Sequence, residues 1–157
     1  MARWPWIVFR ICCTVTAVLI FDQAVFAGQF LAGSFGALHT HRENATAAGI
    51  AVLVTGIAAI PVRLRGGGPR WPAYACLGLF ALTAAQIGLG FARLLAIHVP
   101  LGVAIIVLTL LLTGWSWRAA PGDRRRAGGA VMPESHSGSA QHAEACVAET
   151  RTEAAKS

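Results

Sequence analysis

The stretch NATAAGIAVLVTGIAAIPV, from Asn44 to Val62, contains no Asp, Glu, Lys or Arg. The hydrocarbon core of a bilayer is about 30 Å thick, and about 20 residues of helix cross it. A spanning segment must also pair its own backbone polar groups, which an α-helix does. We therefore predict that this stretch is a transmembrane helix.

Three further apolar segments occupy residues 11–35, 71–92 and 94–117, and Asp22 in the first is their only charged residue. Apolar residues make up 55% of the chain and charged residues 13%, whereas soluble domains carry about 25% charged residues. Four such segments leave no polar face for water, which disfavours a soluble helical protein. The sequence predicts an all-α polytopic membrane four-helix bundle, with helices at about 11–35, 44–62, 71–92 and 97–117.

The arginines predict the orientation of the bundle. Only Arg42 and Arg93 lie on one side, and the other basic residues precede the first segment, separate the second from the third, or follow the fourth. The positive-inside rule then places both termini in the cytoplasm. The tryptophans flank the segments on this same side, as an aromatic belt does: Trp4, Trp6, Trp71, Trp115 and Trp117. Pro72 and Pro100 suit the first turns of the third and fourth helices.

The composition also indicates which partners the protein has and where in the cell it lies. The net charge of +6 lies at the predicted membrane surfaces without a basic helix face or a base-stacking array, so we expect a lipid bilayer and no nucleic acid as partner. The Ala/Gly/Arg bias is typical of a bacterial protein, and we expect the inner (plasma) membrane. Residues 119–157 are polar and rich in Gly, Ser and Ala, which predicts a disordered cytoplasmic tail. A cleaved signal peptide ending near residue 27 is the alternative for the N-terminus.

Two stretches of the sequence match each other. QFLAGSFGALHTH runs from Gln29 to His41 and QIGLGFARLLAIH from Gln86 to His98, an offset of 57 residues. Both begin with Gln and end in His, two residue types that are rare in the apolar part. This pattern predicts two parallel-repeat helix pairs, related by a pseudo-two-fold axis along the membrane normal. His41 and His98 are then expected to face each other at equal depth near the outer surface.

A facing pair of histidines suggests a cofactor site. Two imidazoles on opposed helices of a bundle can hold haem iron from both sides. Small residues would let a flat ring approach the backbone: Gly33, Gly36, Gly90 and Gly102. Two other interpretations stay open, namely histidines that lie at the membrane interface and bind nothing, and glycines that serve tight helix packing.

The segments HTHRENA, at His39–Ala45, and HVPLG, at His98–Gly102, resemble one four-helix half of the haem A synthase family. The chain is also similar to small uncharacterised four-helix bacterial integral membrane proteins. The family has two such halves, each with histidines at the outer ends of its second and fourth helices. The resemblance implies His41 and His98 as metal ligands. Because one half is present and Glu43 follows the histidine rather than preceding it, haem b binding is expected in place of haem A synthesis.

Other polar residues in the predicted membrane region are candidates for function. Asp22 could handle protons or pair with Arg10, because acids inside a span are often functional. Gln29 and Gln86 could hydrogen-bond to each other between the first and third helices. Arg42 and Arg93 could pair with haem propionates, or could anchor the helices at the interface.

These features favour a small membrane protein that binds haem b through two histidines, for electron transfer or haem handling. One alternative is a non-catalytic membrane component without cofactor, which packs with a partner protein or forms a homodimer. A second alternative is a quinone-linked or transport subunit that uses Asp22. The chain has no ATP-binding loop and no nucleophile–base motif, so independent catalytic activity is not expected.

Overall fold

A computed structural model describes residues 3–119, and this part of the chain contains four α-helices and no strand. The helices are α1 (Trp4–Leu31), α2 (Ala37–Leu64), α3 (Trp71–Phe91) and α4 (Leu95–Arg118). Each is long and apolar enough to cross a membrane. The prediction of an all-α fold with four helices suited to a membrane is confirmed. The predicted tail lies outside the described residues from residue 120 onward.

The helix ends differ from the predicted ones. The first helix begins at Trp4 rather than at residue 11, with Pro5 in its first turn, where a residue without an N–H is tolerated. The second begins at Ala37 rather than at residue 44. Helices extend beyond the hydrocarbon core, so an apolar run marks the span and not the helix end. The prediction for Pro100 is wrong, because α4 begins at Leu95 and Pro100 lies inside it.

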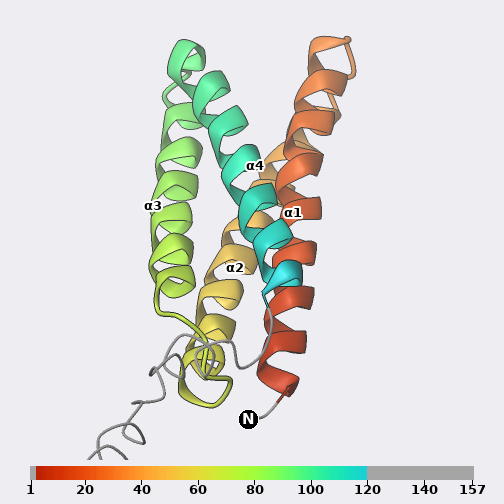
Figure 1. Ribbon diagram of the computed structural model, residues 1–157. Helices are drawn as coiled ribbons and strands as arrows, with labels where there is room; N and C mark the ends of the chain where they lie inside the picture. The colour runs from red at the N-terminus through yellow and green to blue at the C-terminus, as the bar shows by residue number, and fades with distance from the viewer. Residues whose placement is uncertain (1–2, 120–157) are drawn as a thin grey trace, which may run out of the picture. The chain divides into compact units, whose positions relative to one another are not determined.

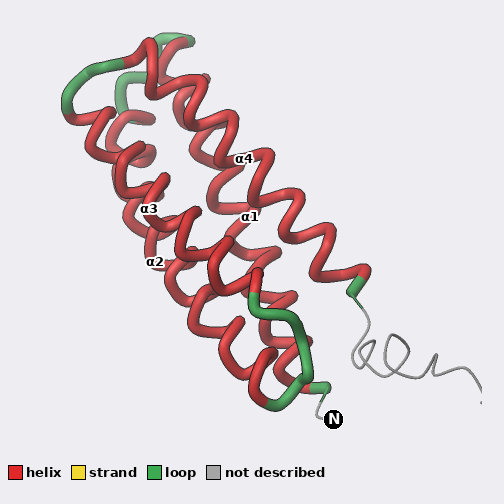
Figure 2. Tube along the Cα trace, turned by 60° about the vertical axis from the view of Figure 1, so that its left-hand side comes forward, coloured by secondary structure: helices red, strands yellow, loops and turns green. Residues whose placement is uncertain are grey.

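Each helix packs against two neighbours, in the order α1, α2, α3, α4 and back to α1. The backbones of the diagonal pairs, α1 with α3 and α2 with α4, do not approach one another in the described residues. The α1–α2 and α3–α4 connections lie at the same end of the bundle, at the top of Figure 1. Figure 2 shows the α2–α3 connection at the opposite end, beside the start of α1. The bundle therefore consists of two helical hairpins packed side by side.

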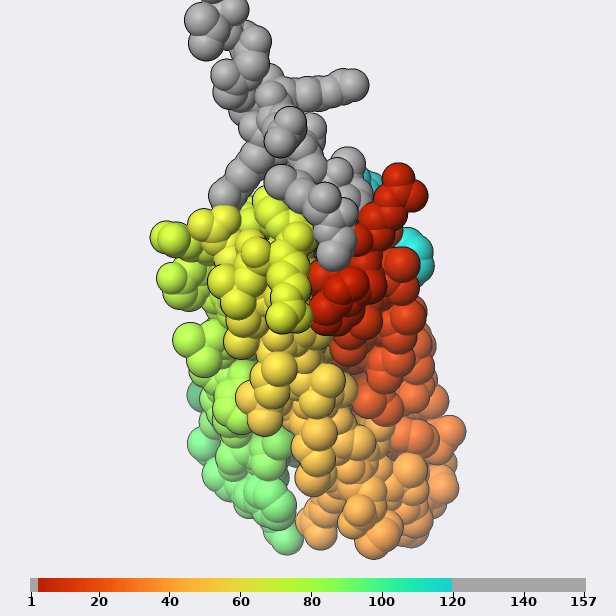
Figure 3. Space-filling model, turned by 90° about the horizontal axis from the view of Figure 1, so that it is seen from below, coloured from red at the N-terminus to blue at the C-terminus, as the bar shows by residue number. Residues whose placement is uncertain are grey.

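The packed core occupies only part of the bundle's length. Buried residues of α1 run from Pro5 to Ile20, and those of α3 from Pro72 to Thr83. In α4 they begin at Ile105, and in α2 they begin at Ala48 apart from Ala37. The half of the bundle near the α2–α3 connection is thus packed, while the other half contains almost no buried residue. The tips of the two hairpins accordingly form separate lobes in Figure 3.

Tryptophans and an arginine join the helices at the packed end. Trp6 is 2% exposed, and its Nε1–H donates to the carbonyl of Gly66 at 3.2 Å. The Trp115 ring packs against Trp6 and Trp71, with centroid separations of 5.9 Å and 4.3 Å. The expectation that all five tryptophans form an interfacial belt is therefore wrong for Trp6, which fills the core.

Arg10 fastens the end of α4 to α1. Its guanidinium donates to the carbonyl oxygens of Ser116 and Ala119, at 3.0 Å and 2.8 Å. The last carbonyls of a helix have no partner within the helix, and a cation beside them also meets the negative end of the helix dipole. The suggested pairing of Arg10 with Asp22 is wrong, because the Arg10 guanidinium binds main-chain carbonyls at the C-terminal end of α4 instead.

We predict that Trp6→Phe lowers the free energy of unfolding by about 1–3 kcal/mol, because it leaves the Gly66 carbonyl without its donor. Trp4→Phe is the matched control, since Trp4 is 49% exposed and its replacement should change stability little. Unfolding of both variants in mixed detergent micelles, followed by circular dichroism, checks the difference. Equal stability of the two variants would contradict the structural role of the Trp6 hydrogen bond.

Candidate functional site

His41 and His98 come together in the half of the bundle that has almost no buried residues. His41 is the fifth residue of α2 and His98 the fourth residue of α4, at the end where the hairpins turn. Their ring centroids lie 6.4 Å apart, with the ring planes inclined by 58°. The two helices are diagonal neighbours whose backbones do not approach. The imidazoles therefore reach toward each other across the interior of the bundle.

Hydrogen bonds fix the protonation pattern of both rings. His41 Nδ1 lies 3.1 Å from the carbonyl oxygen of Gln23, and His98 Nδ1 lies 3.0 Å from that of Gln86. A carbonyl oxygen only accepts, so Nδ1 of each ring must carry the proton. Nε2 of each neutral ring then has a free lone pair. A metal-binding histidine has this arrangement, in which the N–H of the other ring nitrogen donates to an oxygen.

Gln86 binds His98 a second time. Its side-chain Nε2 donates to the main-chain carbonyl of His98 at 2.8 Å. A Cβ at Gly90 would lie 3.1 Å from Cε1 of the His98 ring, and one at Gly102 would lie 2.8 Å from Gln86 Nε2. Two of the four predicted glycines thus make room for this arrangement. Gly33 and Gly36 have no such neighbours, and Gly33, with φ of +96°, serves the turn.

The two hairpins are not related by one sequence offset. The N–H of Ala32 bonds the carbonyl of Gly28, and the N–H of Ala92 bonds that of Gly88, so the ends of α1 and α3 correspond at an offset of 60 residues. The histidines correspond at 57. Gln29 is exposed near the end of α1, whereas Gln86 is half-buried farther from the end of α3. The expected Gln29–Gln86 hydrogen bond is wrong, because Gln29 is exposed and Gln86 Nε2 donates to the His98 carbonyl instead.

Gln23 is a residue of this site that the sequence did not indicate. Its main-chain carbonyl accepts from His41, and its side-chain Nε2 is buried without a partner in the described part of the chain. The same holds for Oε1 of Gln86. A buried polar atom without a partner is unfavourable by about 1–3 kcal/mol. These two atoms therefore mark where a bound molecule could place polar groups of its own.

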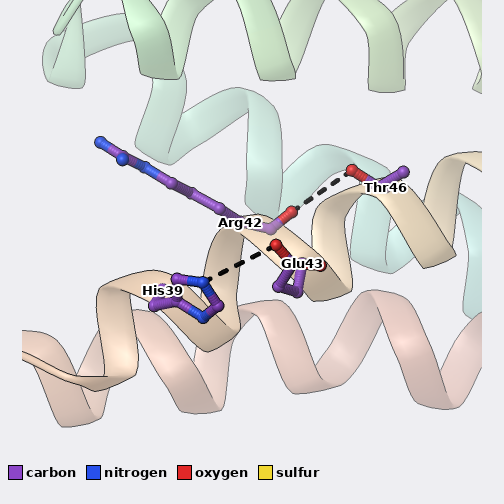
Figure 4. A network of polar contacts seen from close by, with 4 residues as sticks. All are labelled: His39, Arg42, Glu43 and Thr46. Carbon is purple, nitrogen blue, oxygen red and sulfur yellow. Dashed lines mark hydrogen bonds and ion pairs between the residues drawn. The ribbon is translucent and has the colours of Figure 1, made fainter.

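The remaining predicted residues surround the pair without joining it. His39 and Glu43 are exposed and 3.9 Å apart on the outside of α2 (Figure 4). Arg42 is exposed and in that view extends away from α1. Arg93 is exposed in the α3–α4 connection, with φ of +59°. Asp22 is half-buried, and no hydrogen bond or ion pair reaches its side chain from residues 3–119.

The pair offers two nitrogen ligands and no more. Among the described residues, no group of three or more His, Cys, Asp or Glu side chains could hold a metal ion. A structural zinc site needs four protein ligands. Any metal held between His41 and His98 must therefore bring its other ligands with it.

Comparison of the chain with protein-family models, with curated proteins and with solved structures gives no match. The functional interpretation therefore depends on the geometry of the site.

We predict that ¹⁵N NMR of histidine-labelled protein finds His41 and His98 in the Nδ1–H form, because only that form donates to the Gln23 and Gln86 carbonyls. His39 is the internal control, since its side chain is 81% exposed and no carbonyl fixes its tautomer. Single His→Gln variants identify these three signals among those of the five histidines. An Nε2–H form for either buried ring would contradict the hydrogen bonding described for it.

Proposed function

We propose that this chain is a small integral membrane protein that binds haem b between His41 and His98, for electron transfer or haem handling. The separation of the two rings carries the proposal. Two imidazole nitrogens bound to one metal ion, each at about 2.0–2.1 Å, place the ring centroids about 6 Å apart. The centroids of His41 and His98 are 6.4 Å apart, and the Nε2 atoms are the free ones.

Haem suits a site with only two protein ligands, because the porphyrin supplies the other four nitrogens. When bound, it supplies one-electron chemistry tuned by its axial ligands. A plane that stands between the two rings extends toward α1 and α3, whose backbones do not approach each other. That half of the bundle also lacks a packed core. A cofactor held there would lie away from the packed core.

Charged groups near the site suit the edge of this cofactor. Arg42 and Arg93 are exposed at the same end of the bundle as the histidines. Their guanidinium groups could bind the propionates by charge-assisted hydrogen bonds. The unpartnered Gln23 Nε2 adds a neutral donor. These donors support the proposed haem b site.

We predict that full-length protein made in haem-replete cells is coloured, with a Soret band that shifts on dithionite reduction. Replacing both ligands, with His41→Ala and His98→Ala, should abolish the band. Gly90→Ala should lower haem retention about tenfold or more, because its Cβ would displace the His98 ring and the bond that orients it. Absorbance at the Soret maximum per mole of protein measures each effect.

Gly88→Ala is the matched control for Gly90→Ala, since a Cβ at Gly88 meets nothing within 4 Å. It should keep the haem content of the wild type. A colourless wild type would sink the haem proposal and favour a membrane component without cofactor. Haem that persists in the double histidine variant would show that other residues hold it.

We also propose that both termini face the cytoplasm and that the histidine pair lies near the outer surface of the plasma membrane. Arg3, Arg63, Arg65, Arg70 and Arg118 are exposed or half-buried at the packed end, and among the described residues only Arg42 and Arg93 lie at the other. Cationic residues flanking spans concentrate on the cytoplasmic side. The two hairpins are then parallel, each running outward and back.

We predict that Ser34→Cys, in the exposed α1–α2 connection, reacts with a membrane-impermeant thiol reagent in intact cells. Arg70→Cys, exposed before α3, should react only after the cells are broken. Both variants are made in a background whose native cysteines are replaced by serine or alanine. The reverse labelling pattern would contradict the proposed orientation.

A further inference from the structure

We infer that His98 is the fixed ligand of this site and His41 the releasable one, so that a small neutral molecule can take the place of His41. The inference rests on the proposed function, because it concerns the metal held between the two rings. It adds a binding activity, the reversible uptake of a diatomic ligand such as carbon monoxide on the His41 side. Its basis is the unequal support of the two imidazoles.

His98 is held from several directions. Its Nδ1–H donates to the Gln86 carbonyl, and its own carbonyl accepts from Gln86 Nε2. Its ring packs on Gly90, where a Cβ would come within 3.1 Å. The α3–α4 connection beneath it spans only residues 92–94. Displacement of the ring breaks its Nδ1–H hydrogen bond and is limited on one side by Gly90, while Gln86 Nε2 holds the main chain that carries the ring.

His41 has one hydrogen bond, from Nδ1–H to the Gln23 carbonyl at 3.1 Å. No glycine near it would place a Cβ against its ring, and the α1–α2 connection is longer, spanning residues 32–36. The Asn44 side chain, one turn further along α2, donates to the Leu19 carbonyl of α1. Among residues 3–119, however, no side chain donates to the main-chain carbonyl of His41 as Gln86 does to that of His98. Less has to change when the His41 ring turns away from the centre of the bundle.

Gln23 supplies the second, independent observation. Its Nε2 is a buried donor without a partner, on the residue whose carbonyl holds His41. A hydrogen-bond donor near an exchangeable position stabilises a diatomic ligand bound there, and the proposal assigns that role to Gln23 Nε2. The other amide of the site, Gln86 Nε2, already donates to the His98 carbonyl. Within the described residues, the side-chain N–H of Gln23, near His41 in the chain of contacts, has no acceptor, whereas that of Gln86 already donates to His98.

The exchange is a substitution without oxidation or reduction. With the group bound, His41 Nε2 would be released with its lone pair, and carbon monoxide would supply the lone pair that replaces it. The proton stays on His41 Nδ1, so no proton is gained or lost.

Dithionite-reduced, haem-loaded full-length protein is mixed with carbon monoxide, and absorbance reports both the extent and the rate of binding. The reduced wild type should bind carbon monoxide. His41→Ala should keep its haem and bind the gas at least about tenfold faster, because no ligand has to leave first. His98→Ala should lose its haem. Gln23→Leu should speed release of the gas, with Gln29→Leu, an exposed amide on the same helix, as its unchanged control.

Reduced, haem-loaded wild type that binds no carbon monoxide would overturn the inference, as would haem that is retained by His98→Ala and lost from His41→Ala. If His41→Ala fails to fold, Gln86→Leu tests the same asymmetry with both ligands present. It should lower haem retention about tenfold or more, and Gln23→Leu should not; equal retention in these two variants contradicts the inference. A colourless wild type, in contrast, contradicts the proposed function itself.

Discussion

The absence of water inside a bilayer is the constraint on which this structure depends. Polar side chains within the spans must find partners on neighbouring helices, and main-chain carbonyls are the acceptors at hand. Asn44 donates to the carbonyl of Leu19, and Thr113 to that of Cys13. The two histidines use Gln23 and Gln86 in the same way. A requirement of membrane folding thus fixes the tautomer of each imidazole and leaves both Nε2 atoms free.

The two ends of the bundle have different roles. At one end, Trp6, Arg10 and the buried residues around them hold the two hairpins together. At the other end the hairpins separate, and each carries one histidine near its turn. The distance between the rings is set by the packed half and by the stiffness of the helices, with no core between them. The two halves of a site built this way need not be equally rigid.

The fold was largely predictable from the sequence, because long uncharged apolar segments allow few structures other than helices in a membrane. Helix ends were not, since the polar run around His41 and Arg42 is helical in spite of its charge. The histidine pair was found through a sequence repeat that the structure keeps only in part. The 57-residue offset pairs His41 with His98, which come together, and Gln29 with Gln86, which lie in different surroundings. Gln23 escaped prediction because its role belongs to its main-chain carbonyl, which every residue has. The burial of the Gln23 side-chain amide depends on how the helices pack, which the spacing of residues in the sequence does not show.

Electron paramagnetic resonance of the oxidised protein, made with ¹⁵N-labelled histidine, tests the central claim most directly. Two imidazoles on one iron give a low-spin ferric signal with hyperfine coupling to two histidine nitrogens, and the account predicts that signal for the wild type. A high-spin signal, or coupling to one histidine alone, would contradict a metal held between His41 and His98.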